Sequence, residues 1–103
     1  MMMKTYALVL NETNATSVVR SAFKNIDRCL SERGHKKKTL SDDIDFVLVW
    51  GTESEVETVK AKGKPFFDLT RCTGIGVAIS TFPGKVRVQA FEVDKKVFFD
   101  VED

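Results

Sequence analysis

Two short, continuously apolar segments constrain the fold of this 103-residue chain more than any other feature. They are Tyr6–Leu10, "YALVL", and Phe46–Trp50, "FVLVW". Short runs rich in valine, leucine and aromatic residues are typical of strands that are buried on both faces. The two segments therefore predict a sheet with apolar side chains on both of its faces.

Two helices are predicted beside these strands. Residues 15–33 repeat apolar side chains at the helical period, with Asn14 as the expected N-cap and Gly34 as the expected C′ residue. Strand, helix and strand then form a βαβ unit with a right-handed crossover. A shorter helix follows the second strand, because Thr52–Glu55 fits a capping box and Gly63 is a suitable stop.

The last third of the chain is predicted to be β-structure. The candidate strands are Pro65–Thr70, Gly74–Phe82, Lys85–Val93 and Lys96–Val101. The order β-α-β-α-β-β-β-β predicts one α+β domain over residues 1–103, with an α/β-like N-terminal half. We expect two layers, in which both helices pack on one face of a mixed sheet.

Composition excludes several classes of protein. Hydrophobic residues make up 43% of the chain and charged residues 30%, which argues against disorder. No apolar run approaches the ~20 residues of a membrane span. Cys29 and Cys72 match neither a disulfide framework nor a metal-ligand spacing. We expect a cytoplasmic protein without membrane association, cofactor or metal.

The net charge of +1 hides an uneven distribution. Residues 1–41 carry eight Lys or Arg and three acids, whereas residues 42–103 carry eight and twelve. Six cations are expected on one side of the domain: Arg20, Lys24, Arg28, Lys36, Lys37 and Lys38. They predict a patch for nucleic-acid phosphates or an acidic protein, or alternatively a solvated helix face.

Tyr6 and Trp50 mark an apolar face of the expected sheet. If both helices cover the same face, the other face stays exposed, and large apolar patches usually contact a partner. This face predicts a homodimer or an interface with another protein. The alternative is that the C-terminal hairpin folds over the sheet and closes the core.

The segment "RCTGIGV" contains the one candidate reactive pair. Cys72 is the candidate nucleophile, and Arg71 would hold an oxyanion. The structural alternative is a turn or bulge at Thr73–Gly74 and close backbone packing at Gly76. His35 is expected to be a solvated loop residue.

These patterns favour a small, non-catalytic binding or regulatory protein that acts through a protein surface as an inhibitor or accessory factor. A protein partner or self-association is expected. The first alternative is a nucleic-acid-binding protein that uses the basic first-helix stripe. The second is a small enzyme with Cys72 as nucleophile.

Overall fold

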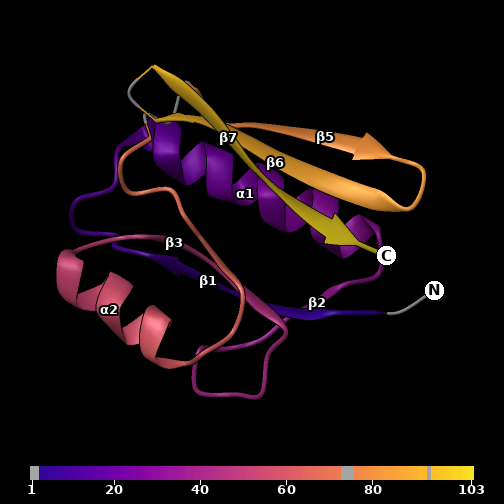
Figure 1. The fold of residues 1–103 in the computed structure, drawn as a ribbon, viewed down its shortest axis with the longest axis horizontal. Helices are drawn as coiled ribbons and strands as arrows, with labels where there is room; N and C mark the ends of the chain where they lie inside the picture. The colour runs from indigo at the N-terminus through magenta and orange to yellow at the C-terminus, as the bar shows by residue number, and fades with distance from the viewer. Residues whose placement is uncertain (1–2, 73–75, 93) are drawn as a thin grey trace.

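The computed structural model describes residues 3–72, 76–92 and 94–103, and the expected α+β class and element order are confirmed (Figure 1). In chain order the elements are β1 Thr5–Leu10, α1 Ser17–Glu32, β2 Lys36–Lys37, β3 Phe46–Trp50, α2 Glu53–Ala61, β4 Phe66–Asp68, β5 Ala78–Phe82, β6 Lys85–Glu92 and β7 Lys95–Glu102. The two-residue strand β2 is an addition to the predicted order.

The strands form two sheets. Sheet A is parallel, with strand order β2-β1-β3-β4, and sheet B is antiparallel, with order β5-β6-β7. In sheet A, β1 and β3 pair along their length, from Tyr6 opposite Phe46 to Leu10 opposite Trp50. Sheet B is a meander whose first turn is the predicted Pro83–Gly84.

The two helices cover opposite faces of sheet A, which corrects the expectation of one shared face (Figure 1). Phe23, Ile26 and Leu30 of α1 pack in the core that contains Tyr6 and Leu48. Val56 and Val59 of α2 pack in the other core, with Ala7, Val47 and Val49.

The reason lies in the strand order. The helix α1 connects β1 to β2 on one side of β1, whereas α2 connects β3 to β4 in the other direction, so the two crossovers that contain helices run in opposite directions. Right-handed crossovers in opposite directions place their helices on opposite faces.

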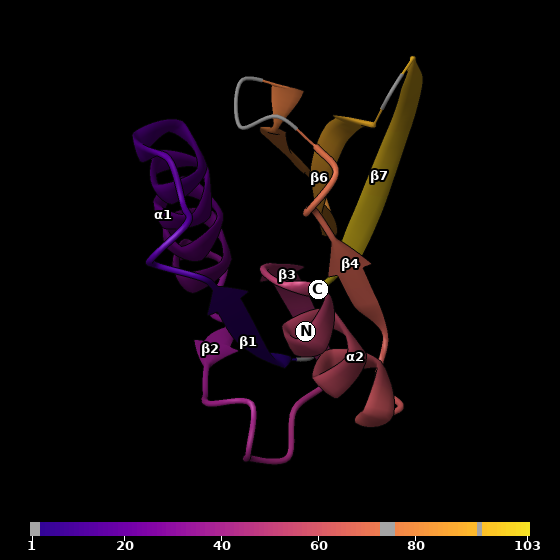
Figure 2. The same cartoon turned by 90° about the vertical axis from the view of Figure 1, so that its left-hand side faces the viewer.

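Sheet B lies beside α1 over the same face of sheet A (Figure 2). A row of aromatic rings joins the sheets: Tyr6 stacks on Phe46 at 5.6 Å, Phe46 lies 5.7 Å from Phe99, and Phe99 stacks on Phe67 at 5.7 Å. Tyr6 is 0% exposed and Trp50 is half-buried. Of the two alternatives for the Tyr6/Trp50 face, the structure therefore has the one in which the C-terminal strands fold over the sheet and close the core.

Local signals set the ends of the helices. The N-cap of α1 is Thr16, not Asn14, because the Thr16 hydroxyl accepts the Val19 amide at 3.3 Å. The predicted capping box of α2 is confirmed. Gly34 has φ of +91°, a conformation that suits its predicted place after α1. Neither described helix is long and apolar enough to cross a membrane.

The predicted features of "RCTGIGV" are tested only in part. The expected turn at Thr73–Gly74 lies outside the described residues. At Gly76, a Cβ atom would come within 3.4 Å of the Phe91 side chain. This is an ordinary van der Waals separation, so packing against β6 does not require a glycine at this position.

Candidate binding groove

An open groove of about 1120 Å³ runs along the edge of β1. Leu8, Val9 and Leu10 form its floor. The α1 wall consists of Arg20, Phe23, Lys24 and Asp27, and the facing wall of Lys37, Lys38, Thr39, Leu40 and Asp42. Glu12 also lines the groove. The groove therefore combines apolar side chains on its floor with charged side chains on both walls.

Ion pairs hold the walls in place. The Arg20 Nε lies 3.1 Å from Glu12 Oε2, and an Arg20 Nη donates to the Glu12 carbonyl at 2.7 Å. Asp27 joins three elements: it accepts the Tyr6 hydroxyl at 2.6 Å and lies 3.0 Å from Lys37 Nζ. Burial, followed by this hydrogen bond, raises the pKa of Tyr6 to about 12. The tyrosine therefore stays a neutral donor to Asp27.

The loop wall is shaped by Asp42. Its carboxylate accepts both the amide and the hydroxyl of Thr39, at 3.0 and 2.9 Å. These hydrogen bonds, that of the Thr39 hydroxyl first, lower the pKa of Asp42. With the neighbouring charges engaged in this way, Lys24 and Lys38 form no ion pair within the described part of the chain. These two exposed lysines are the cations that the groove offers to a ligand.

The predicted basic stripe divides between the groove and the solvent. Arg20, Lys24, Lys37 and Lys38 line the groove, whereas Arg28 and Lys36 lie outside it. Arg28 pairs with Glu32 at 3.3 Å. Three of the six cations thus have carboxylate partners, so less of the positive charge is available to phosphates than the sequence suggested.

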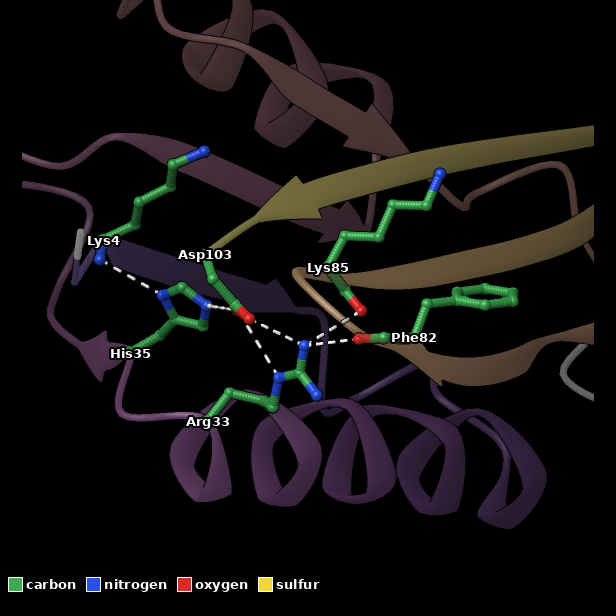
Figure 3. Close-up of polar contacts among 6 residues, drawn as sticks. All are labelled: Lys4, Arg33, His35, Phe82, Lys85 and Asp103. Carbon is green, nitrogen blue, oxygen red and sulfur yellow. Dashed lines mark hydrogen bonds and ion pairs between the residues drawn. The ribbon is translucent and has the colours of Figure 1, made fainter. Parts of the chain in front are cut away.

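His35 is buried, contrary to the expected solvated position. Together with Lys4, Arg33 and Asp103 it forms a polar cluster after the end of β7, which we call the clasp (Figure 3). Its Nδ1 accepts the Lys4 amide at 3.1 Å, and its Nε2 lies 3.4 Å from Asp103 Oδ1 without hydrogen-bond geometry. Asp103 also pairs with Arg33 at 2.7 Å, and this hydrogen bond is the main reason that the pKa of Asp103 is lowered. The two ring nitrogens of His35 therefore face the Lys4 amide and the Asp103 carboxylate, and neither faces the groove.

Cys72 has the surroundings of a core thiol. It is 6% exposed, and burial, followed by the charges of Glu92 and Asp68, raises its pKa. Arg71 is exposed and lies 3.7 Å from Glu92. A raised pKa disfavours the thiolate that a nucleophile requires. Within the described residues, no group of three His, Cys, Asp or Glu could hold a metal ion.

The outer face of sheet B carries exposed aromatic side chains. Phe82, Phe91 and Phe98 are 40%, 58% and 54% exposed. Arg87 lies over the Phe98 ring, 4.2 Å from its centroid, and is bound to Asp100 at 2.7 and 3.0 Å. The arginine is already neutralised, so among the described residues this face has no free guanidinium to offer a ligand.

The strand order also creates a switch point between the carboxyl ends of β1 and β3, where open α/β sheets often bind ligands. Glu55 occupies it: its carboxylate accepts the Asn11 side-chain amide at 2.8 Å and the Thr52 amide at 2.9 Å. These bonds, the one from the Thr52 backbone first, lower the pKa of Glu55. A fixed carboxylate makes this point unsuitable for a phosphate.

No family model, curated protein or solved structure matches this chain, so its function has to be inferred from its geometry. The sequence identified four cations of the groove but not its floor. In the sequence, Leu8 and Leu10 look like ordinary strand residues. Their backbone edge is open because β2 pairs only with Thr5 and Tyr6 and ends before it reaches them. The one sequence signal for this open edge is "KKK" at residues 36–38, because lysine is disfavoured in strands and a strand there would be short.

Proposed function

We propose that this protein is a small, non-catalytic binding protein that acts as an inhibitor or accessory factor by holding a segment of another protein in the groove beside β1. The observation that carries this proposal is the combination of an apolar floor at Leu8 and Leu10 with unpaired lysines, Lys24 and Lys38, on the two walls. Pockets with apolar linings and a few placed polar groups are typical of binding sites.

The volume and the surroundings of the groove support the same proposal. About 1120 Å³ is large for a metabolite pocket, and the groove is open along the molecular surface. The side chains considered for chemistry are engaged elsewhere, since Cys72 is in the core and His35 is in the clasp. We also propose a cytoplasmic location, which the two free, buried cysteines support.

A nucleic-acid ligand is the alternative that the six cations still allow. The support for it is weaker, because three of them are ion-paired and Phe23, the aromatic residue of the groove, is 5% exposed. Single-strand binders use exposed aromatic side chains for stacking. Binding that weakens with salt, with a log–log slope of about −0.9 per phosphate contact on duplex DNA, would favour this alternative.

Selection of linear peptides from a displayed library tests the proposal. Peptides selected on the wild-type protein should bind the double variant Lys24→Glu, Lys38→Glu about tenfold or more weakly, because both wall charges are reversed. The matched control is Lys95→Glu, Lys96→Glu, which reverses two lysines of sheet B and should leave affinity unchanged.

Two results would contradict the proposal. One is a set of peptides that responds to the sheet B variant and ignores the groove variant. The other is a protein that light scattering finds monomeric and that selects no peptide dependent on Lys24 and Lys38.

A further inference from the structure

We infer that the groove binds its partner by strand addition: an extended segment with apolar and acidic side chains pairs with the backbone of Leu8 and Leu10 and continues sheet A beyond β2. This inference rests on the proposed function and adds the mode of binding and the chemistry of the partner. It follows from the backbone of β1, from the course of the chain after β2, and from the charges on the groove walls.

The free edge of β1 begins where β2 ends. The registered pairs of β1 with β2 are Thr5 with Lys36 and Tyr6 with Lys37. The Lys38 amide donates to the Tyr6 carbonyl at 2.8 Å, whereas the Asp45 amide donates to the Thr5 carbonyl at 2.9 Å. The backbone groups of successive β1 residues therefore point alternately toward β2 and toward β3.

By the same alternation, Leu8 and Leu10 direct their amides and carbonyls toward the β2 side. Among the described residues, none pairs with either leucine on that side. Four backbone groups thus line the floor of the groove as donors and acceptors for another strand.

Proteins usually protect such an edge with proline, a bulge or an inward-facing charge. The sequence Tyr6–Leu10 contains neither proline nor a charged residue. After β2 the chain turns away from α1 and forms the far wall of the groove (Figure 2). The space that a longer β2 would fill is the groove itself.

The groove walls indicate which strand would fit. Side chains of an added strand alternate between the α1 side, with Leu8 and Phe23, and the other side, with Val9 and Leu40. Apolar side chains suit both positions. Lys24 stands on the α1 wall and Lys38 on the loop wall, so carboxylates in the segment would find a cation on either side.

The same charges disfavour a second copy of this chain as the occupant. If two β1 edges paired about a two-fold axis, each groove would bring its own Lys24 and Lys38 to the contact. Like charges placed together at an interface oppose association. The carboxylates of an acidic partner segment would instead be attracted by Lys24 and Lys38.

The test uses two acetylated peptides of about eight residues, a common strand length, that alternate valine with glutamate or valine with lysine. The glutamate peptide should bind the wild-type protein more tightly by about tenfold or more. On binding, the amide signals of Leu8 and Leu10 should shift in NMR spectra, while those of sheet B stay in place. Equal affinity of the two peptides would overturn the inference.

Backbone N-methylation separates strand addition from binding through side chains alone. Every second amide of an extended peptide faces the same neighbour, so two complementary methylated forms of the glutamate peptide are prepared. The form that loses the amides facing β1 should bind about tenfold or more weakly, and the other form should bind as before. Equal affinities of the two forms would overturn strand addition.

The outcomes also distinguish this inference from the proposed function. Peptide binding that depends on Lys24 and Lys38 but not on the methylation pattern would support the proposed function of the groove and contradict strand addition. Binding that ignores these two lysines contradicts both. A particle mass that doubles with concentration, while the amide signals of Leu8 and Leu10 shift as the mass rises, would show a second copy as the occupant and overturn the inference.

Discussion

At the scale of single residues, Asp100 gives the clearest pH dependence. Its carboxylate accepts hydrogen bonds from Arg87 at 2.7 and 3.0 Å and from Lys85 at 3.3 Å. These bonds, those of Arg87 first, lower its pKa to about 2, below the unfolded value of about 3.9. A carboxylate whose pKa is lowered by folding stabilises the protein above its unfolded pKa, and this contribution disappears as the pH falls through the folded value.

We therefore expect Asp100→Asn to lower the free energy of unfolding at about pH 7 and to have a smaller effect at about pH 3, where part of the wild-type contribution is already lost. Urea denaturation at both pH values measures the difference. Asp43→Asn is the control, because the Asp43 side chain is 97% exposed and lies 3.7 Å from Lys64. An Asp100→Asn effect of equal size at both pH values would contradict this linkage.

At the scale of elements, Arg33 joins the end of α1 to one end of sheet B, where Phe82, Lys85 and Asp103 lie side by side (Figure 3). Its guanidinium donates to the Phe82 carbonyl at 2.6 Å, to the Lys85 carbonyl at 3.3 Å and to Asp103 at 2.7 Å. A lysine ammonium cannot reproduce this planar arrangement of donors. The hydrogen bonds of Arg33 therefore fix how α1 and sheet B lie together.

We expect Arg33→Lys to destabilise the protein by about 1–3 kcal/mol, the range for losing hydrogen bonds of a charged, half-buried group. Arg28→Lys is the matched control on the same helix. Its ion pair with Glu32 is exposed, so the substitution should cost less than about 0.5 kcal/mol. Denaturant unfolding of both variants makes the comparison, and equal losses would mean that the clasp contributes no more than a surface pair.

The elements also show why the sequence predicted some features and missed others. The helices and the strands of sheet A have local signals, such as the capping box of α2 and the apolar runs of β1 and β3. Lys36–Lys37 has no such signal, because β2 exists through its pairing with β1. Because β2 was not predicted, the sequence indicated that both helices cover one face of the sheet. For the same reason, the open edge at Leu8 and Leu10 was not predicted either.

The clasp was equally invisible, for a different reason. His35 and Asp103 lie 68 positions apart in the sequence and meet only when β7 returns to the end of α1. Their environment depends on tertiary contacts that neither local pattern encodes. The cations of the groove were predictable because four of them share a helix face or a lysine run. Which of them stay unpaired depends on Glu12 and Asp27, which lie eight and ten positions from Arg20 and Lys37.

At the scale of the whole molecule, one core connects the two sheets. The ring of Phe46, 3% exposed, lies between Tyr6 of β1 and Phe99 of β7. The same core includes Val86 and Val88 of β6. Because neither sheet has this apolar surface covered without the other, we expect them to unfold in a single cooperative transition.

Phe46→Ala tests this coupling. Removing the buried ring should lower the free energy of unfolding by about 3–5 kcal/mol. The loss should be the same whether it is followed by Trp50 fluorescence in sheet A or by amide exchange of Val88 in sheet B. Phe98→Ala is the control, because that ring is 54% exposed and contributes mainly a contact with Arg87, worth about 1 kcal/mol or less. Separate transitions at Trp50 and Val88 would show that the two sheets are stable independently and that the shared core does not couple them.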